Sequence, residues 1–390
     1  MPEILFSAPF LFVCATNFCL FLVVSTWSFL PVFVVETGGA TADVGLLMGS
    51  LGVTSLGSLP LIAPLIDKHG RKFFILSGIL VIGLSNAGFL LFDSYSHLMI
   101  LVRLLQGVAF AACFNGCATA VVDLLPKNYR GRGIGLFGIS GSLAVAIGPF
   151  LGEQVLLKFG FDYYFYLLIA FGLVGSVFAL FVKDSPRETS GRTKLPGFFP
   201  TAFNGGHLGM MTLAAIFGSG FAAMNTFFPL QAKSLNLQAG IFFTCYGASL
   251  IFVRLCCGAV IDRLDRDKLI LACLAAFGFL LISTSQITLM FQTILLGALF
   301  GLCQGISYPA MMARMVDKSD ETNRGVVVAL FTGSFGVGIN VSVLAWGMIG
   351  EIKGLVFMFI LGGIAMFISA AIFWAGVTLR SNVYEKRRVF

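Results

Sequence analysis

An arginine and a glutamine stand inside an apolar run that is long enough to cross a membrane. Arg103 lies about six residues into the run 97–125, and Gln106 follows one helical turn later. A charge inside a membrane needs a partner or a watery cavity. We therefore predict that Arg103 attracts an anionic substrate or modulates a proton-binding carboxylate. The alternative is that its side chain reaches toward the membrane surface or holds backbone carbonyls.

The acidic residues indicate where a proton could bind. All eighteen lie in predicted loops or near the ends of apolar runs, and none is clearly central. If protons drive this protein, the candidates are Glu153, Asp43 and Glu36, which lie toward the face opposite the termini. The alternative interpretation of each is a solvated carboxylate at the end of a loop.

The composition indicates which solvent surrounds the elements that carry these side chains. Of the 390 residues, 58% are hydrophobic and only 11% are charged, whereas soluble domains have about 25% charged residues. A membrane span needs about 20 predominantly apolar residues. The sequence therefore predicts an all-α membrane protein with twelve spans, at about 8–35, 43–66, 72–92, 97–125, 133–157, 162–182, 207–232, 239–261, 268–287, 290–316, 325–349 and 354–379.

Several other classes of protein are disfavoured by the sequence. The net charge of +7 is spread over many loops, whereas nucleic-acid-binding domains gather basic residues on one soluble face. The nine cysteines form no CxxC pair, and no catalytic triad, metal-site pattern or G-x-x-x-x-G-K-[ST] loop occurs. We therefore expect a protein that is not an enzyme and that uses no cofactor, metal, nucleic acid or ATP.

The 25 lysines and arginines predict how the chain crosses the membrane. Nineteen fall in loops on the side of both termini, three fall in the opposite loops, and three lie within spans. This bias follows the positive-inside rule, so we expect both termini and the hydrophilic linker 183–206 to face the cytoplasm. The linker divides the chain into two six-span halves, 1–182 and 207–390.

The two halves repeat motifs in the same order. "WSFLP" at 27–31 matches "NTFFP" at 225–229, and Asp67 recurs with its neighbours as Asp262, 195 positions later. Duplicated six-helix halves in one membrane chain are typical of secondary transporters, which bind substrate between the halves near mid-membrane. The repeat therefore predicts two pseudo-symmetric six-helix bundles.

Three motifs resemble those of the major facilitator superfamily. The signature of the loop between spans 2 and 3 appears as "APLIDKHGRK" at 63–72, that of span 4 as "RLLQG" at 103–107, and that of span 5 as "GPFLGE" at 148–153. Glu153 replaces the final glycine of the span 5 pattern. With one upstream glycine, this motif comprises Gly141, Gly148, Pro149 and Gly152. The resemblance implies the major facilitator fold and, from the last motif, proton-coupled export of small amphipathic molecules.

The resemblance also implies a conformational gate on the cytoplasmic side. Asp67 ends the second span, and a carboxylate at a helix C-terminus is unfavourable by about 0.3–1 kcal/mol unless something attracts it. We predict that it pairs with nearby cations and, across the halves, with the helix that begins near Arg324. The alternative is that these loops only set topology and shape a turn. The residues assigned to the gate are Asp67, Arg71, Lys72, Asp262, Arg266 and Arg324.

In members of the family, spans 1, 4, 7 and 10 line the central cavity. The polar and aromatic residues on those spans, with one residue of span 11, predict a substrate site. An isolated asparagine can instead join membrane helices, and that alternative stays open. The predicted site comprises Asn17, Trp27, Arg103, Gln106, Asn115, Asn225, Gln304, Tyr308 and Asn340.

These expectations together describe a monomeric carrier in a bacterial inner membrane. Its energy source is the proton gradient, and its partners are a small-molecule substrate and membrane lipid. Two alternatives stay open: uptake of an anionic metabolite anchored on Arg103, and a non-transporting receptor or scaffold with the same fold.

Overall fold

The computed structural model describes residues 7–126, 129–184, 207–257, 264–317, 319 and 323–388. Within these residues the chain folds into helices with no strand, and twelve helical segments are long and apolar enough to cross a membrane. The predicted all-α class and the number of spans are therefore confirmed. Asp262 and most of the predicted linker lie outside the described residues.

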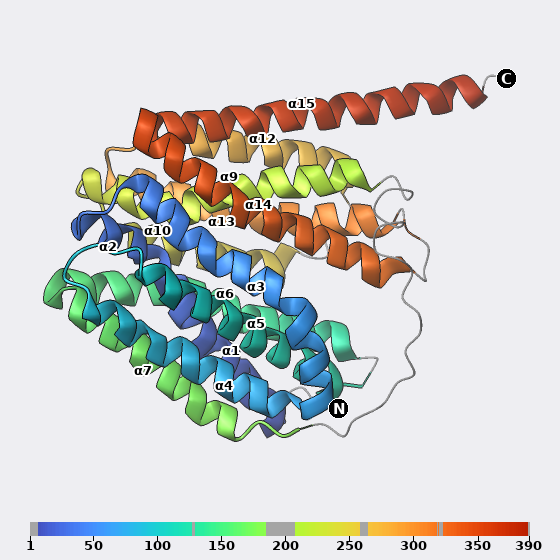
Figure 1. The fold of residues 1–390 in the computed structure, drawn as a ribbon. Helices are drawn as coiled ribbons and strands as arrows, with labels where there is room; N and C mark the ends of the chain where they lie inside the picture. The colour runs from blue at the N-terminus through green and yellow to red at the C-terminus, as the bar shows by residue number, and fades with distance from the viewer. Residues whose placement is uncertain are drawn as a thin grey trace.

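The first six spans run from α1 to α7, coloured blue to green in Figure 1. The first span is interrupted, because a 3₁₀ turn at Trp27–Phe29 separates α1 from α2. A second 3₁₀ segment, Asn86–Leu91, prolongs α4. The helices are α1 (Ala8–Thr26), α2 (Leu30–Glu36), α3 (Thr41–His69), α4 (Arg71–Ser85), α5 (Met99–Leu124), α6 (Arg130–Phe159) and α7 (Phe161–Leu180).

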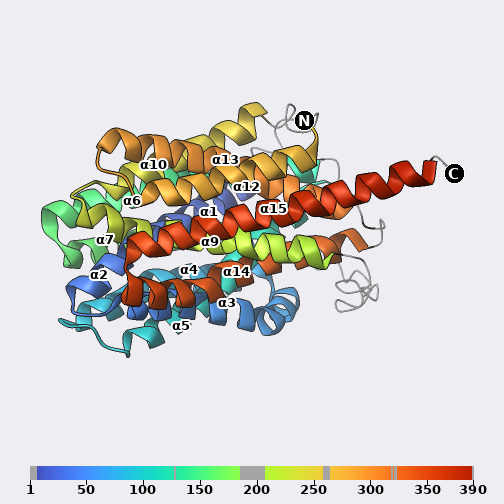
Figure 2. The ribbon, with the colours of Figure 1, turned by 90° about the horizontal axis from the view of Figure 1, so that it is seen from above.

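The second six spans run from α9 to α15 and lie beside the first six in Figure 1, coloured yellow-green to red. The span that contains α10 ends in a π-helical turn, Val253–Cys257. The last helix extends well beyond the rest of the bundle (Figure 2). The helices are α9 (Leu208–Ser234), α10 (Ala239–Phe252), α12 (Arg266–Thr284), α13 (Met290–Asp317), α14 (Arg324–Lys353) and α15 (Leu355–Arg388).

Helix packing repeats between the two sets of spans. Helix α1 packs on α6 as α9 packs on α14, α3 packs on α5 as α10 packs on α13, and α4 packs on α7 as α12 packs on α15. Gly160 and Gly354 make the corresponding turns after α6 and α14, with φ of 85° and 84°. Glycine adopts this left-handed conformation without steric cost. The repeated motifs of the sequence thus correspond to a repeated arrangement of helices.

The first and seventh spans are the most enclosed elements of the bundle. In their most apolar windows 72% and 67% of the residues are buried, against 33–50% in the other spans. A membrane span that hides most of its surface from lipid must lie between other helices. These two spans therefore form the centre of the bundle, around which the site residues are placed.

The two ends of the bundle hold different features. The terminal end, on the right of Figure 1, holds the beginning of α1 and the end of α15. The distal end, on the left, holds the connections from α2 to α3, from α6 to α7, from α9 to α10 and from α14 to α15.

Candidate functional site

Helices α3 and α14 form the first of two seams between the halves. They run antiparallel, and a Cβ atom placed on Gly347 would lie 2.9 Å from the Cα atom of Gly45, so no side chain fits there. Gly49 and Gly52 continue the contact along α3, the latter against Asn340. Small residues let membrane helices approach closely. The backbones of α3 and α14 are therefore in direct contact along this seam.

Helices α6 and α10 form the second seam, which the repeat relates to the first. The hydroxyl of Thr244 donates a hydrogen bond of 2.9 Å to the carbonyl oxygen of Ala146. A Cβ atom on Gly247 would lie 2.6 Å from the Cα atom of Ala146, so the two backbones are also in contact here. Polar bonds thus supplement close packing in the second seam.

The carboxylate of Glu153 joins α6 to the first turn of α10. Its Oε1 atom accepts the backbone N–H of Ala239 at 2.7 Å, and its Oε2 atom accepts that of Gly240 at 2.9 Å. The first N–H groups of a helix have no partner within the helix, and the helix N-terminus favours an anion. Glu153 is only 5% exposed, so both oxygens depend on these two donors.

A second carboxylate occupies the corresponding place in the first seam. Glu351, near the end of α14, accepts the backbone N–H of Thr41, the first residue of α3, at 2.7 Å. Unlike Glu153, it is exposed to solvent. We call the contacts of Glu153 with α10 and of Glu351 with α3 the helix clamps. The sequence analysis missed Glu351 as a site residue, although "GE" at 350–351 repeats "GE" at 152–153 after 198 positions.

The other two carboxylates predicted to bind protons have different surroundings. Glu36, at the end of α2, forms an ion pair with Lys233, and both side chains are about half exposed (46% and 48%). Asp43 accepts the N–H of Ala40 at 2.9 Å and so caps its own helix. Burial and the nearby Asp43 carboxylate raise the pKa of Tyr95 to about 12. Of the three, only Glu153 combines burial with a contact between the halves.

The seams open toward the terminal end. On α14, a Cβ atom on Gly336 would lie 3.7 Å from Leu56, whereas one on Gly333 would meet nothing within 4 Å among the described residues. Gly57 on α3 and Gly135 on α6 face equally open space in the described part of the chain. The halves are thus joined at the distal end. The first seam separates toward the terminal end, whereas in the second seam the side chain of Arg254 still lies against Gly138.

The described gate residues lie at the terminal end, where Asp67, Arg71 and Arg266 form ion pairs within their own halves. Asp67, whose side chain is 71% exposed, lies 3.7 Å from Arg71. Arg71 is also 2.8 Å from Asp123, and the backbone N–H of Lys72 donates to Asp184 at 2.8 Å.

In the second half, Arg266 forms an ion pair with Asp317, and Arg324 begins α14. The predicted pairing of Asp67 across the halves stays a prediction, and Asp262, which was also assigned to the gate, lies outside the described residues.

Arg103 lies inside the first half and is 2% exposed. It donates to Gln106 at 2.7 Å and to the carbonyl oxygen of Leu47 at 3.4 Å, and it lies 4.5 Å from the ring centroid of Trp27. Trp27 in turn donates to Asn86 at 2.9 Å, a residue that the sequence analysis did not select. The partners of this cation are thus an amide, a carbonyl and an aromatic face, and its predicted role in binding stays untested.

The predicted asparagines mostly bond within their own helices. Asn115, Asn225 and Asn340 each donate to the carbonyl oxygen one turn earlier. Asn17 instead donates to Ser140 at 2.9 Å and so joins α1 to α6. Their predicted contact with substrate stays a prediction.

The other predicted binding residues lie in an aromatic cluster of the second half. Gln304 accepts a hydrogen bond from Tyr246. The ring of Tyr308 packs edge-on against Phe331 and Phe335, with centroids 5.1 and 5.0 Å apart. This cluster places two predicted polar groups beside apolar rings.

The glycine motif on α6 positions that helix against α1 and α10. Gly148 and Gly152 lie against the side chains of Ser25 and Thr26, and Gly141 lies near Asn17. The carbonyl oxygen of Pro149 would be 3.3 Å from a Cβ atom on Gly240. The motif therefore brings α6 close to the first span and places Glu153 over the start of α10.

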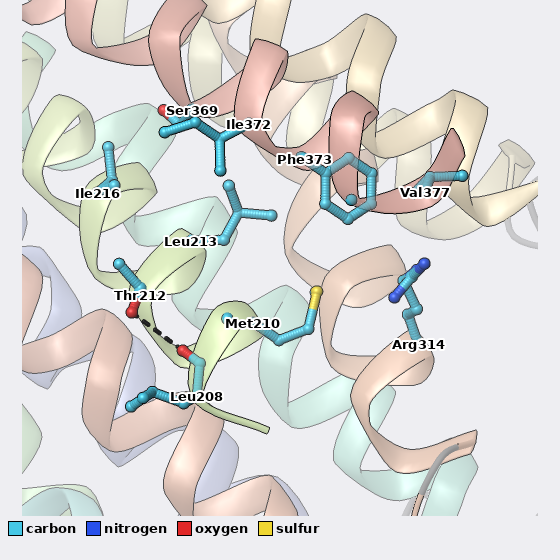
Figure 3. A pocket seen from close by; sticks show the side chains of 12 residues that line it. Leu208, Met210, Thr212, Leu213, Ile216, Arg314, Ser369, Ile372, Phe373 and Val377 are labelled. Atoms are coloured by element: carbon cyan, nitrogen blue, oxygen red, sulfur yellow. Dashed lines mark hydrogen bonds between the residues drawn. The ribbon is translucent and has the colours of Figure 1, made fainter. Parts of the chain in front are cut away.

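A cavity of about 440 Å³ lies near the terminal end between α9, α13 and α15. Its wall is largely apolar and includes Leu213, Ile216, Phe373 and Val377 (Figure 3). Arg314, the charged residue in its lining, bonds to Asp267 through two nitrogen atoms and lies 5.0 Å from the ring centroid of Phe373. Its charge is thus compensated within the protein.

Comparison with known proteins gives consistent matches. The family profile described as Major Facilitator Superfamily matches residues 12–238 and 210–388. The staphylopine export protein of Staphylococcus aureus is 23% identical over 87% of this chain and 88% of its own length. An uncharacterized MFS-type transporter of Methanocaldococcus jannaschii is 23% identical over 83% of this chain and 86% of its own. The quinolone resistance protein NorA of Staphylococcus aureus is 24% identical over 45% of each chain.

Solved structures resemble the whole arrangement of helices. The nucleoside transporter NupG superposes with a TM-score of 0.79 at 16% identity, covering 94% of this chain and 98% of that one. A point mutant of the peptide transporter POT superposes with a TM-score of 0.76 at 12% identity, covering 94% and 93%. At these identities the likeness is one of fold.

Proposed function

The chain belongs to the major facilitator superfamily, and from that premise we propose that it exports small amphipathic molecules by proton antiport. In this proposal its two halves rock against each other about the two seams. The substrate enters between the halves at the terminal end and leaves at the distal end. It is a transporter of a family whose members move small molecules, and the direction and the coupling ion are the proposed parts.

The observation that carries the proposal is the difference between the two ends. The helix clamps and the glycines join the halves at the distal end, while Gly57, Gly135 and Gly333 face open space toward the terminal end. A carrier that works by alternating access rests in a state that is closed on one side and open on the other. The excess of lysine and arginine on the side of the termini supports a cytoplasmic terminal end, in a bacterial inner membrane.

Two further observations support export. The glycine motif that the family associates with antiporters lies on α6, at the seam with α10. Two of the similar proteins carry export or drug resistance in their names. Staphylopine and a quinolone are therefore reasonable first substrates to test, and a nucleoside represents the structural relative NupG.

The first alternative is uptake of an anionic metabolite anchored on Arg103. This interpretation has less support, because Arg103 is enclosed and already bound to Gln106, Leu47 and Trp27. The second alternative, a receptor or scaffold that moves nothing, predicts no flux for any compound.

Inside-out vesicles provide the test. Vesicles with and without the protein are given an acidic interior and supplied with staphylopine, norfloxacin or uridine. Export by antiport predicts accumulation of at least one compound, only with the protein, and its loss when a protonophore collapses the gradient. Proton-driven accumulation only in right-side-out vesicles would establish uptake instead, and absence of flux across a broad panel would favour the receptor.

A further inference from the structure

We propose that the cavity between α9, α13 and α15 binds an anionic phospholipid of the leaflet at the terminal end, with one acyl chain inside the cavity and the headgroup beside the basic end of α15. This inference goes beyond the proposed function and does not depend on it, because an exporter, an importer and a receptor can all carry such a site.

The chemistry of the cavity wall fits a hydrocarbon chain. The wall is largely apolar, and the polar side chains in its described lining already have partners. Thr212 and Ser369 each donate a hydrogen bond to a carbonyl oxygen of their own helix, and Arg314 is paired with Asp267. A polar ligand would lose its hydration here and gain no free partner, which is costly. An acyl chain needs no such partner.

The cavity opens on the outside of the bundle, between α9 and α15. Two of its lining residues, Leu208 and Ile372, are more than half exposed. A Cβ atom on Gly209 or on Gly376, which also line it, would meet nothing within 4 Å among the described residues. Helix α15 forms the outer edge of the bundle (Figure 1). In a membrane, lipid therefore has direct access to the cavity.

The depth of the cavity corresponds to one leaflet of a bilayer. On α9 its lining runs from Leu208, the first residue of the helix, to Ile216, and on α15 it runs from Val377 back to Ser369. A helix covers about 12 Å in eight residues, and half of the hydrocarbon core of a bilayer is about 15 Å thick. The apolar segment of α15 ends at Thr378. The cavity thus begins at the membrane boundary and reaches toward the middle of the bilayer, as an acyl chain does.

The part of α15 beyond the mouth of the cavity is basic. The helix continues past the apolar segment to Arg388 (Figure 2), and Arg380 follows Gly376 by one helical turn. Clusters of lysine and arginine directly beyond a membrane span attract anionic headgroups. An apolar cavity and a cluster of positive charge are thus adjacent on one helix, and an anionic phospholipid complements both. The basic residues of 379–388 are Arg380, Lys386, Arg387 and Arg388, and the acidic one is Glu385.

Native mass spectrometry of the purified, delipidated full chain tests the site. The protein in detergent is titrated with phosphatidylglycerol or with phosphatidylcholine, both carrying two oleoyl chains, and the apparent Kd of the first bound lipid is measured. We expect this Kd to be at least about fivefold lower for phosphatidylglycerol, because the basic residues attract its anionic headgroup. Equal values would mean that a neutral lipid is held as well, and would overturn the proposal.

Two variants on α15 test the cavity itself. Gly376→Phe fills the mouth and should weaken binding of phosphatidylglycerol at least about fivefold, since part of the acyl chain then stays unburied. Ala375→Phe is the matched control, because Ala375 is exposed on the same helix and does not line the cavity. It should leave binding unchanged. Gly209→Phe fills the mouth from α9 and provides the same test if Gly376→Phe does not fold.

A third variant tests the headgroup. It replaces the four basic residues of the α15 end together, as Arg380→Gln, Lys386→Gln, Arg387→Gln and Arg388→Gln. The preference for phosphatidylglycerol should disappear while binding of phosphatidylcholine stays the same. A preference that persists in this variant would overturn the assignment of the headgroup and the proposal with it.

The remaining outcomes are equally decisive. Phosphatidylglycerol binding that is unchanged in both mouth-filling variants would overturn the site. A dimer that binds no lipid and becomes a monomer in Gly376→Phe would show that a second copy covers the cavity, and would overturn it too. The expected binding in a protein that moves no substrate would refute the proposed export and leave the lipid site standing. Export by a protein that does not bind phosphatidylglycerol would refute the lipid site alone.

Discussion

The two seams have the same backbone arrangement and different chemistry. In the seam of α3 and α14, glycines bring main chain against main chain, and an exposed carboxylate accepts one N–H. In the seam of α6 and α10, a threonine bonds across the interface, and a buried carboxylate accepts two N–H groups. The repeat has thus preserved the geometry of the interface while one seam has become mainly steric and the other electrostatic.

The largest effect is expected where the steric seam has no room. Gly347→Leu places a side chain against the main chain at Gly45. Overpacking costs about 1–3 kcal/mol, and more where the obstacle is backbone that cannot rotate away. We expect it to separate α3 from α14 at the distal end and to speed hydrogen exchange at the start of α3 at least about tenfold.

Gly333→Leu is the matched control, since it lies on the same helix and faces open space. It should leave exchange at the start of α3 unchanged. Equal exchange rates in the two variants would contradict the assignment of the seam to close packing.

The next effect concerns the electrostatic seam. Glu153→Gln keeps one acceptor oxygen, so it loses one of the two hydrogen bonds, at a cost of about 1.5–3 kcal/mol, and should lower the thermal stability of the purified protein at neutral pH. Thermal unfolding of both proteins measures the difference.

Glu351→Gln should lower the stability by less than about 1 kcal/mol, because solvent reaches that site. If the two variants have the same melting temperature at neutral pH, the buried carboxylate of the second seam contributes no more to stability than the exposed carboxylate of the first, and the proposed difference between the seams is wrong.

A smaller effect is expected from the hydrogen bond that the Thr244 side chain makes across the second seam. Thr244→Val keeps the shape of the side chain and removes the hydrogen bond to Ala146, which should cost about 0.5–1.5 kcal/mol. Thr212→Val serves as the control, since Thr212 is exposed and bonds only to Leu208 of its own helix. Thermal unfolding of both variants measures the difference. An equal loss of stability in Thr244→Val and Thr212→Val would show that the hydrogen bond across the seam adds nothing to stability.

The smallest effect is expected at the ion pair of Glu36 and Lys233. Both side chains are about half exposed, and such pairs contribute about 0–1 kcal/mol, less at high salt. Glu36→Gln should therefore change thermal stability only slightly and transport less than about twofold. A loss as large as that of Glu153→Gln would mean that the distal end depends on this pair instead of the clamps.

Features set by local sequence were predictable. The apolar runs at 8–35 and 43–66 became the first span, Ala8–Glu36, and α3, Thr41–His69, because membrane spans follow from length and polarity. The repeat of motifs predicted the repeated packing of helices. The 3₁₀ turn at Trp27–Phe29 was not predicted, although Pro31 signals it, because proline has no N–H to bond the carbonyl of Trp27 four residues earlier.

Contacts between segments that are far apart in the sequence were harder to predict. The sequence indicated that Arg103 needs a partner, but not that the ring of Trp27 and the carbonyl of Leu47 would lie against it. Nor did it indicate that Asn86 would accept a hydrogen bond from Trp27. The role of Glu351 was hidden in the same way, because its partner is a backbone N–H of the other half. Such contacts depend on how the halves meet, and local polarity carries no information about that.

The contact of Gly45 with Gly347 also has an electrical consequence. Where two backbones touch, no file of water molecules fits between them at that level, so the closed state is insulated along the contacts of Gly45, Gly49 and Gly52 with α14. The membrane voltage then falls across this insulated part of the protein, and moving one elementary charge through it is worth about 2.3 kcal/mol per 100 mV. The clamp carboxylates lie close to it, so voltage should act on this protein mainly through its distal end.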